Sequence, residues 1–336
     1  MHGQDTNTSS EVATNSIVVS SHGPDAVLEQ ARTGIGRPAG AQVLIAVRLA
    51  GVNYWDIMQR RGQVPLPASG IPGVEGVGVV VECGPDAPAG LLGRRVAWSK
   101  VAGSYADRVL ASAELVIEVP DEVPDEVAAG VLMQGITAQY LADDTCPLGA
   151  GESAVVFAAA GGVGSLLTQC LGHRGVQAVA VVGADAKVVA ARTAGASDVV
   201  VDGPDLVEQV RELVPSGVSA VFDANGGALT PRGFDLLRPR GMLVLYGTAA
   251  GPLPPFDTAR MGTGSLYLTR ASGKDYAGTA ADWQRRAAIV MARAASGELR
   301  VQVGRCADLA QAAELHELMQ TRASTGKLLL RMPGSV

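Results

Sequence analysis

The sequence predicts an α/β protein in which a doubly wound parallel sheet is joined to a β-rich partner domain. From Glu152 to Thr269, short β-rich runs alternate with amphipathic segments, which is the pattern of a parallel sheet covered by helices. On both sides of this region, strand-like runs are separated by Gly and Pro, with few helical stretches. The chain of 336 residues is also long enough to bury two cores, which favours two domains.

The alternating region contains six strand candidates with helical stretches between them. The strand candidates are Ala154–Ala158, Gln177–Val182, Asp198–Val201, Ser219–Phe222, Met242–Tyr246 and Ser265–Thr269. The crossover helices are expected at Ser165–His173, Asp185–Ala194, Asp205–Leu213 and Thr230–Leu237. Six strands in this order complete a doubly wound domain.

The flanking regions supply the elements of the partner domain. Strand-like runs lie at Ala41–Leu49, Gly76–Glu82, Arg94–Ser99 and Tyr105–Pro120. After the sixth strand come two helical stretches and a strand-like run, at Asp282–Ala295, Asp308–Arg322 and Lys327–Met332. We expect this last part of the chain to pack back on the first domain. Residues 1–15, rich in Ser, Thr and Asn, are interpreted as a disordered tail.

Composition and charge exclude several classes of function. The net charge of −6 argues against a broad nucleic-acid or anionic-membrane surface, which needs clustered Lys and Arg. The start of the chain lacks the basic and apolar runs of a secretory signal, and no stretch has the roughly 18 consecutive apolar residues of a membrane span. We therefore expect a cytoplasmic protein with no nucleic-acid or membrane partner. The four cysteines are scattered, with no C-x-x-C pair to hold a metal.

The strongest local signal is the Gly-rich segment Ala158–Gly164, which lies between the first strand candidate and the helix expected near Ser165. Glycines let the backbone turn tightly and approach a pyrophosphate, and the start of the following helix presents N–H groups and a positive dipole end to that anion. The segment therefore predicts a dinucleotide site, rather than a loop that only turns a strand into a helix. Ala159 stands where the usual fingerprint has its first Gly.

The end of the second strand candidate indicates which dinucleotide is bound. An Asp or Glu at this place would bind the ribose hydroxyls of NAD and repel an additional phosphate. The sequence has Val182 and Gly183 here, and Lys187 follows on the next helical turn, where its cation can reach a 2′-phosphate. NADPH is therefore the expected cofactor. Lys187 is alternatively a solvated helix lysine, and Asp185 and Asp202 lie nearby and oppose a phosphate.

Further segments occur in the order and spacing of a known family. They are Gly51–Asp56, Ile71–Gly76, Leu132–Tyr140, Leu237–Gly241 and Gly264–Arg270. With these and the Gly-rich turn, the chain resembles the zinc-independent quinone oxidoreductase, or zeta-crystallin-like, branch of the medium-chain dehydrogenases and reductases. The matching segments are spread over nearly the whole chain, from about Val43 to Met332.

The resemblance implies a Rossmann domain inserted in a GroES-like catalytic domain that is built from both ends of the chain. Residues 16–135 and 273–336 would form the catalytic domain, and residues 136–272 the NADPH-binding Rossmann domain. Zinc-dependent members of the family carry a catalytic Cys and a Gly-His-Glu that supply metal ligands. This chain has Asn53 and Gly73-Val74-Glu75 at those places, which implies a site without metal.

The resemblance also assigns residues to the site. It implies that Asn53 is the catalytic residue and lies, with Thr137, near the nicotinamide end of the cofactor. The residues implied to contact the cofactor are Asn53, Thr137, Ala160, Gly161, Gly162, Val163, Gly164, Gly183, Lys187, Asn225, Gly247, Thr248, Arg270 and Arg322. For Arg322, the equal alternative is a cation that compensates the end of a helix. The family often has Tyr where this chain has Asp202, so one adenosine contact differs.

The implied substrate pocket contains Tyr54, Met58 and Val64. Family quinone reductases commonly have tyrosines where this chain has Met58 and Val64, so we expect an apolar pocket in which solvent supplies the proton. Without a Lewis acid, alcohol oxidation loses its activation, whereas an enone or a quinone needs only an aligned hydride. The expected reaction is hydride transfer from NADPH to a small-molecule quinone or an α,β-unsaturated carbonyl compound.

Two other functions remain open. The protein is alternatively a stereospecific tailoring enoyl reductase of polyketide or other secondary metabolism, because related enoyl reductase domains vary between Tyr and Val at the place of Val64. It is alternatively a non-catalytic, crystallin-like NADPH-binding protein. We also expect a homodimer through residues 265–269, because this strand lies at the margin of the sheet and in the family the matching strand pairs with its copy.

Overall fold

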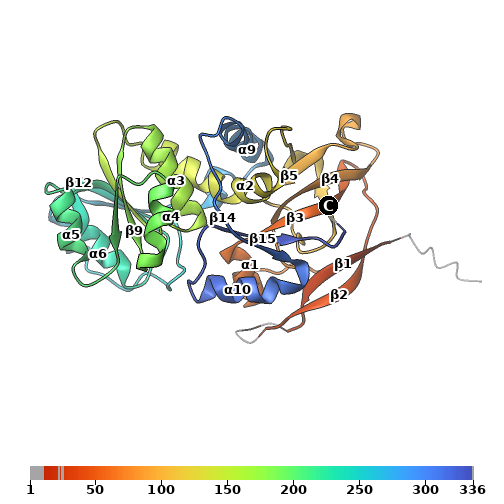
Figure 1. Cartoon of the computed structure of the whole chain (residues 1–336), viewed down its shortest axis with the longest axis horizontal. Helices are drawn as coiled ribbons and strands as arrows, with labels where there is room; N and C mark the ends of the chain where they lie inside the picture. Colours follow the sequence, from red (N-terminus) through yellow and green to blue (C-terminus); the bar gives the residue numbers. More distant parts are fainter. Residues whose placement is uncertain (1–10, 22, 24–25, 335–336) are drawn as a thin grey trace, which may run out of the picture. The chain divides into compact units, whose positions relative to one another are not determined.

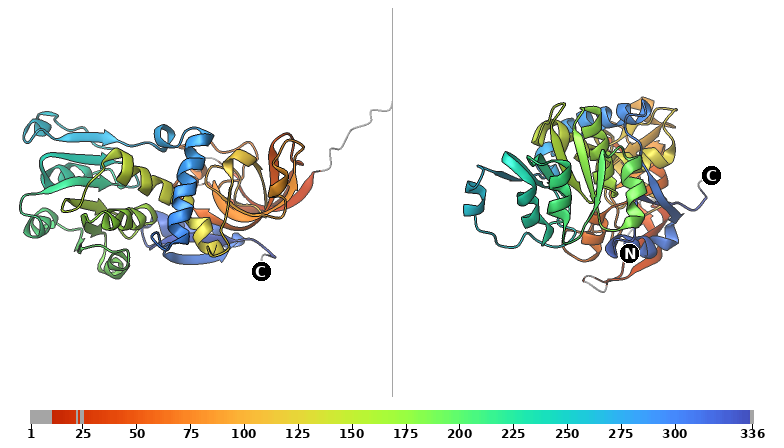
Figure 2. Two further views of the ribbon diagram at one scale, coloured as in Figure 1. Left: turned by 90° about the horizontal axis from the view of Figure 1, so that it is seen from above. Right: turned by 60° about the vertical axis from the view of Figure 1, so that its left-hand side comes forward.

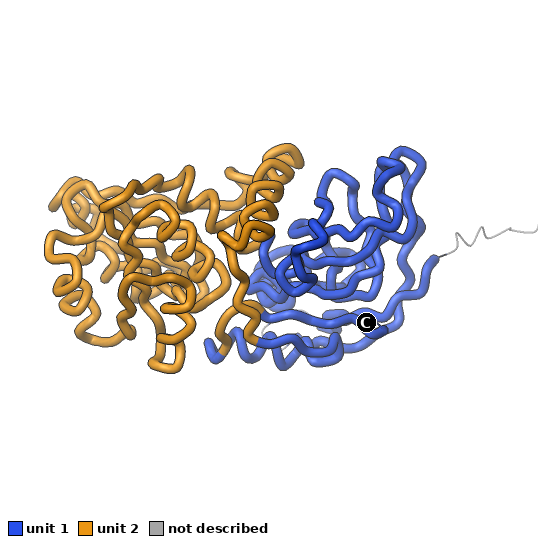
Figure 3. The backbone as a smooth tube through the Cα atoms, turned by 45° about the horizontal axis from the view of Figure 1, so that its top comes forward, with its two compact units in different colours: residues 1–132, 305–323, 328–336 blue, residues 133–304, 324–327 orange. Residues whose placement is uncertain are grey.

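The structure of the chain, a computed structural model, describes residues 11–21, 23 and 26–334. Contacts divide the chain into two compact units (Figure 3). Unit 1 comprises residues 1–132, 305–323 and 328–336, and unit 2 comprises residues 133–304 and 324–327. Each unit has its own hydrophobic core. No helix among the described residues is long and apolar enough to span a membrane.

Unit 2 contains a six-stranded parallel sheet, visible in Figures 1 and 2. Its strands are β8 (Ser153–Phe157), β9 (Gln177–Val182), β10 (Asp198–Val201), β11 (Val218–Asp223), β12 (Leu237–Leu245) and β13 (Tyr267–Arg270). The spatial order is β10-β9-β8-β11-β12-β13. The chain reverses its direction of progress across the sheet between β8 and β11, which is the switch point of a doubly wound fold.

Helices cover both faces of this sheet (Figure 1). They are α3 (Gly162–His173), α4 (Val188–Thr193), α5 (Leu206–Leu213) and α6 (Leu229–Leu236). Every residue of β8 and β11 is buried, because strands in the middle of a parallel sheet are covered on both faces. The predicted strands, crossover helices and doubly wound fold class are confirmed.

Unit 1 contains most of an antiparallel sheet and a separate hairpin. The strands of the sheet are β3 (Gln42–Val52), β4 (Glu75–Cys83), β5 (Arg95–Trp98), β6 (Arg108–Ser112), β7 (Ile117–Glu118), β14 (Val303–Asp308) and β15 (Lys327–Arg331). Their order is β14-β15-β3-β4-β5-β7, with β6 paired to β3. The hairpin consists of β1 (Val12–Val19) and β2 (Leu28–Ile35), and the helices of this unit include α1 (Tyr54–Arg60) and α10 (Ala312–Gln320). The β-rich partner domain is confirmed.

Some elements differ from the expectations. Residues 12–15, expected in the disordered tail, begin β1, and residues 1–10 lie outside the described residues. This strand has no apolar alternation, because Thr14 and Ser16 are two of its buried residues. The helix α2 (Asp125–Tyr140) was not expected as a helix, because apolar residues surround it and leave no amphipathic stripe. Residues 273–304, expected with the catalytic domain, are grouped with unit 2.

Candidate functional site

The predicted site residues fall into two groups, one in each unit. Unit 2 contains Thr137, Ala160, Gly161, Gly162, Val163, Gly164, Gly183, Lys187, Asn225, Gly247, Thr248 and Arg270, and unit 1 contains Asn53, Tyr54, Met58, Val64 and Arg322. The contacts within each group show what that group can bind or orient.

The Gly-rich segment forms a tight turn between β8 and α3. Ala158 adopts a left-handed conformation with a φ of 54°, and the N–H of Gly161 donates to the Ala158 carbonyl at 2.9 Å. Gly161 is the N-cap of α3, and its carbonyl accepts the N–H of Ser165 at 2.9 Å. The N–H groups of Gly162 and Gly164 belong to the first turn, which has no intrahelical acceptors for them. This end of α3 therefore offers N–H groups and a positive dipole end to an anion.

A side chain does not fit at one glycine of this turn, Gly164, and at a second, Gly162, it would require a neighbouring side chain to move. A Cβ at Gly164 would lie 2.4 Å from the carbonyl oxygen of Ala158, and a Cβ at Gly162 would lie 2.1 Å from Oε1 of Gln134 on α2. The contact at Gly164 is with backbone, so no side-chain movement can relieve it. Gln134 was not among the predicted site residues. Thr137 lies on the same face of α2, three residues further on, and its hydroxyl donates to the Met133 carbonyl at 2.9 Å.

The end of β9 is open on the side where an adenosine phosphate is expected. Gly183 is exposed, and a Cβ there would meet no atom within 4 Å. Lys187 ends the short helix η4 (Asp185–Lys187) and is half-buried. The opposing carboxylate of Asp202 is paired, because Arg232 on α6 donates to its Oδ1 at 2.9 Å and also to the carbonyl of Gly203. Of the two carboxylates that opposed NADPH in the sequence, that of Asp202 is therefore compensated, by an arginine that the sequence did not reveal.

The loop after β11 is organised by a buried carboxylate. Asp223 has no exposed surface, and its carboxylate accepts the N–H groups of Asn225 at 2.7 Å and Gly226 at 3.1 Å. The hydroxyl of Thr230 donates to the other oxygen at 2.6 Å. Burial raises the pKa of Asp223, and these three hydrogen bonds act in the opposite direction. Asn225 is thus fixed at the carboxyl edge of the sheet, where doubly wound folds bind ligands.

The end of β12 lies beside this loop. A Cβ at Gly247 would lie 2.4 Å from the carbonyl oxygen of Ala224, so the backbones after β11 and β12 approach closely there. Thr248 follows, and its carbonyl accepts the N–H of Gly251 at 3.0 Å. Tyr246, which the sequence did not single out, has a buried hydroxyl without a hydrogen-bond partner among the described residues. Burial, followed by the charge of Asp223, raises the pKa of Tyr246.

Asn53 is held by a buried network in unit 1. The residue is 5% exposed, and its side-chain amide nitrogen donates to Oε2 of Glu75 at 3.1 Å and to the carbonyl of Gly51 at 3.3 Å. A carbonyl can only accept, so these partners fix which end of the amide is the NH₂ group. The backbone N–H of Asn53 donates to Oδ2 of Asp56 at 2.8 Å. The direction of the Asn53 amide is therefore determined on two sides.

Two residues behind Asn53 were missed by the sequence analysis. The hydroxyl of Tyr105 donates to Oδ2 of Asp56 at 3.0 Å and lies 3.0 Å from Nε2 of His316. His316 lies on α10, is fully buried and is linked to Asp56 through the Tyr105 hydroxyl. Burial, followed by the charge of Arg60, lowers the pKa of His316 to about 3, so the imidazole is neutral.

The remaining predicted residues are more exposed. Tyr54 and Met58 are half-buried and four residues apart on α1, so they share one face of the helix, and Val64 lies half-buried in the loop that follows. Arg270 is the exposed last residue of β13. Arg322 follows α10 with a φ of 57°, and its N–H donates to the Met319 carbonyl at 3.2 Å. Both interpretations of Arg322 stay predictions.

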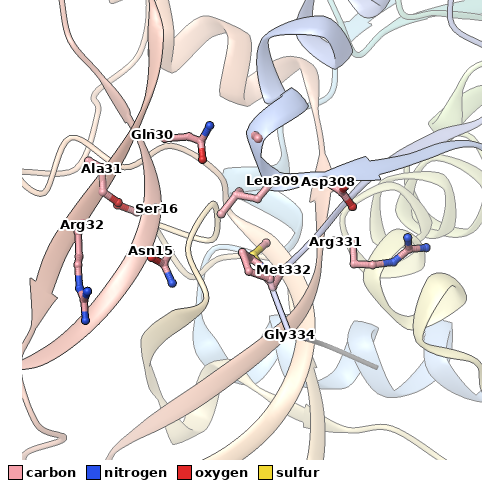
Figure 4. Close-up of a pocket in the computed structure, with 12 residues that line it drawn as sticks. Asn15, Ser16, Gln30, Ala31, Arg32, Asp308, Leu309, Arg331, Met332 and Gly334 are labelled. Carbon is pink, nitrogen blue, oxygen red and sulfur yellow. The ribbon is translucent and has the colours of Figure 1, made fainter.

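Unit 1 also has an open cavity of about 600 Å³ between the β1–β2 hairpin and the end of the chain (Figure 4). It is lined by residues that include Asn15, Arg32, Asp308, Arg331 and Gly334. Arg32 and Arg331 lie on opposite sides of it and point away from each other, so they form no common anion clamp. None of the predicted site residues lines this cavity.

Two family models match the chain. The alcohol dehydrogenase GroES-like domain matches residues 39–141, and the zinc-binding dehydrogenase domain matches residues 162–290. A probable quinone oxidoreductase of Schizosaccharomyces pombe is 32% identical, over 94% of this chain and 96% of the relative. The chain belongs to the quinone oxidoreductase branch of the medium-chain dehydrogenase/reductase superfamily. The resemblance found in the motifs and the Rossmann and GroES-like fold class are thereby confirmed.

Solved structures and a further relative extend this result. A mycobacterial protein complexed with NADPH is 34% identical to this quinone oxidoreductase-family chain, with a TM-score of 0.88 over 95% of this chain and 100% of that one. The Escherichia coli quinone oxidoreductase complexed with NADPH is 29% identical, with the same TM-score and coverage. A 2-haloacrylate reductase of a Burkholderia species is 32% identical over 88% of this chain and 92% of the relative.

One family model describes zinc-binding dehydrogenases, but the residues of this chain do not fit a catalytic zinc site. At the place of the catalytic Cys, the Asn53 amide nitrogen is a donor and is directed at Glu75, and Val74 has no ligating atom. Across the residues that the structure describes, no three His, Cys, Asp or Glu side chains are grouped so that they could hold a metal ion.

Proposed function

We propose that this protein is an NADPH-dependent reductase that transfers hydride to a quinone or to an activated carbon–carbon double bond. The observation that carries the proposal is the turn at Ala158–Gly164, where the backbone is too close for side chains and the start of α3 is left for an anion. The NADPH with which the two solved relatives are complexed supports the choice of cofactor. Bound NADPH would supply the hydride, and the chain supplies binding and orientation.

In this proposal, each group of residues has a separate task. Gly162, Val163 and Gly164 bind the pyrophosphate through backbone N–H groups, and Gly183 with Lys187 admits the 2′-phosphate. Asn53 orients the reacting end through an amide whose direction Glu75 and Gly51 fix.

An electrophilic substrate class follows because Asn53 and Val74 stand where zinc-dependent members of the family carry metal ligands. A quinone, enone or haloacrylate is already polarised, so hydride can add to carbon while a proton from solvent is taken up at the other end of the conjugated system. Met58 and Val64 bring no hydroxyl that could supply this proton. The 2-haloacrylate reductase among the relatives supports including C=C reduction beside quinone reduction.

The test is a substrate panel with purified protein and NADPH. Quinones, enones, 2-haloacrylate and enoyl thioesters are compared by the loss of absorbance of the reduced cofactor, with and without a metal chelator. We expect turnover with at least one class and no effect of the chelator. Gly164→Val should abolish both NADPH binding and turnover. Gly172→Ala, in the same helix and with its nearest atom 3.9 Å from the added Cβ, is the matched control and should retain both.

Two results would redirect the proposal. Turnover confined to enoyl thioesters would favour the stereospecific tailoring enoyl reductase, and Val64→Tyr should then change the stereochemistry of the product. NADPH binding without turnover of any compound would favour the non-catalytic, crystallin-like binding protein. A site role for Val64 is rejected when the tyrosine variant keeps both its substrate range and its product stereochemistry.

We also propose a homodimer through residues 265–269. β13 is an edge strand of its sheet, with β12 as its neighbour, and Tyr267 on it is 56% exposed. An exposed edge with an aromatic side chain is a surface that natural proteins cover or pair. Light scattering at micromolar concentration tests the proposal, and a monomeric mass contradicts it.

A further inference from the structure

A chain of buried polar side chains lies behind the Asn53 turn. Asp56, Tyr105 and His316 have no exposed surface, and they come from α1, from the loop before β6 and from α10. Oδ2 of Asp56 accepts the backbone N–H of Asn53 at 2.8 Å and the hydroxyl of Tyr105 at 3.0 Å, and Nε2 of His316 lies 3.0 Å from the same hydroxyl. The two rings meet edge to face, with centroids 5.8 Å apart.

The direction of these hydrogen bonds follows from the atoms that can only donate. The Asn53 N–H must donate to Oδ2 of Asp56, which makes that oxygen an acceptor. The Tyr105 hydroxyl donates its proton to the same oxygen, so its own oxygen can only accept from His316. Nε2 of His316 must then carry the proton, and Nδ1 is bare. This agrees with Nδ1 having no hydrogen-bond partner among the described residues.

Tyr105 also contacts the other side of the Asn53 site. A Cβ at Gly73, which has a φ of 93°, would lie 2.4 Å from Cδ1 of the Tyr105 ring, so the ring packs directly on this segment. The backbone N–H of Tyr105 donates to the Pro72 carbonyl at 3.0 Å. Two residues further along this segment, Glu75 accepts the Asn53 amide. One side chain thus touches both Asp56 and the segment that leads into Glu75, the two supports of Asn53.

A purely apolar filling of this space would avoid the cost of desolvating three polar groups. Such groups instead specify one arrangement, because every member must keep its partner. We propose that Tyr105 and His316 are positioning residues for Asn53: His316 orients Tyr105, and Tyr105 fixes Asp56, which holds the backbone of Asn53. The functional part of this proposal rests on the proposed role of Asn53 in the reductase.

The first test is spectroscopic and needs no substrate. The chain has four histidines and four asparagines, so selective isotope labelling gives few signals. We expect the His316 ring to show the neutral tautomer protonated at Nε2 and to stay neutral at pH 5. The opposite tautomer, or a protonated ring at that pH, overturns the proposed series of hydrogen bonds from His316 to Asp56. The backbone signal of Asn53, identified by its loss in Asn53→Ser, should shift in both Tyr105→Phe and His316→Leu.

The second test separates positioning from stability. Ser104→Ala is the matched control, because Ser104 is equally buried and its hydroxyl bonds the Trp98 indole at 2.9 Å and the Val101 carbonyl at 2.8 Å, away from Asp56. Tyr105→Phe should lower kcat by about fivefold or more and change the Kd of NADPH by less than about twofold. Ser104→Ala should lower thermal stability and leave kcat and the Asn53 signal unchanged.

A substitution that keeps a hydrogen-bond donor at position 316 should preserve kcat, which provides a rescue test. His316→Gln keeps an N–H that can donate to Tyr105 and should retain most of kcat, whereas His316→Leu has no donor and should behave like Tyr105→Phe. If Leu and Gln give equal kcat values, the positioning role of His316 is refuted. If the Asn53 signal shifts as expected but kcat does not change, Asn53 is held as described but the proposed reaction does not use it. The two His316 variants therefore test the proposed hydrogen-bond network even if Tyr105→Phe does not fold.

Discussion

The pairing of Arg232 with Asp202 makes a specific prediction about cofactor preference. Asp202 directly follows β10, and its N–H donates to the Val182 carbonyl at 2.8 Å, so this acidic residue lies beside Gly183 at the proposed adenosine end. Arg232 compensates its charge through a contact of 2.9 Å. We predict that Arg232→Gln leaves the Asp202 carboxylate uncompensated and lowers the preference for NADPH over NADH.

The size of the effect follows from Coulomb's law. A carboxylate one to two strand spacings away, roughly 7 Å, repels a unit negative charge by about 0.6 kcal/mol in water and by more near a protein surface. The 2′-phosphate carries about 1.5 to 2 negative charges, so the repulsion is about 1–2 kcal/mol. This corresponds to about a tenfold fall in the ratio of the NADPH and NADH affinities.

A double-mutant cycle measures this effect directly. Affinities for NADPH and NADH are determined by fluorescence titration for the wild type, Arg232→Gln, Asp202→Asn and the double variant. Asp202→Asn leaves Arg232 as an uncompensated cation and should raise the NADPH preference. The double variant has the same local charge as the wild type and should return to the wild-type preference. The effect of Arg232→Gln should shrink at high salt, because the pair is only partly buried.

Two results would refute the reasoning. An unchanged preference in Arg232→Gln shows that Asp202 does not face the phosphate. A double variant as weak for NADPH as Arg232→Gln shows that the arginine acts on the phosphate directly or through the fold rather than through Asp202. Loss of the ion pair itself should cost the folded state only about 0–1 kcal/mol, so unfolding does not obscure the outcome.

Three further predictions concern the glycine turn, the buried His316 and the edge strand β13. Gly164→Val places a Cβ 2.4 Å from the Ala158 carbonyl oxygen and should lower the melting temperature and abolish NADPH binding, whereas Gly172→Ala should be neutral or stabilise α3 by up to about 1 kcal/mol, as calorimetry can show. His316 has a folded-state pKa of about 3, below its unfolded value of about 6.5, so the unfolded state binds more protons as the pH falls. Urea unfolding should show that the wild type loses about 2 kcal/mol more than His316→Gln between pH 7 and pH 5. Tyr267→Lys places a charge on the β13 edge and should convert the proposed dimer to a monomer in light scattering, and an unchanged mass contradicts the proposed interface.

Local patterns were sufficient to predict the nucleotide sheet. β9 and β10 have the predicted bounds, because both are short apolar runs that end at Gly or a polar residue. The strand β1 and the helix α2 escaped prediction for opposite reasons. Polar residues of β1 are buried against the fold, and α2 is apolar on most of its surface, so neither shows the alternation or the stripe on which sequence reasoning depends.

The candidate site shows the same limit at the level of single residues. Asn53, Gly162 and Gly164 lie in short sequence motifs, so each can be proposed as a site residue from the sequence alone. The contact between Tyr105 and His316 joins residues 211 positions apart, and no local sequence pattern predicts it. Pairing across such a separation depends on which elements pack together, which a single sequence does not specify.

The turn after β8 shows why one departure from the glycine fingerprint is tolerated. Ala159 occupies the place of the first glycine, but the left-handed residue is Ala158, with a φ of 54°, and it costs roughly 1–2 kcal/mol relative to an ordinary conformation. Ala159 itself is buried and donates to the Val181 carbonyl at 3.2 Å, so its Cβ is accommodated by the core. At Gly164 a Cβ would lie 2.4 Å from the Ala158 carbonyl oxygen, and no side-chain movement can relieve this backbone contact. Glycine is therefore required where the first turn of α3 meets the preceding backbone, whereas alanine is tolerated where the strand ends.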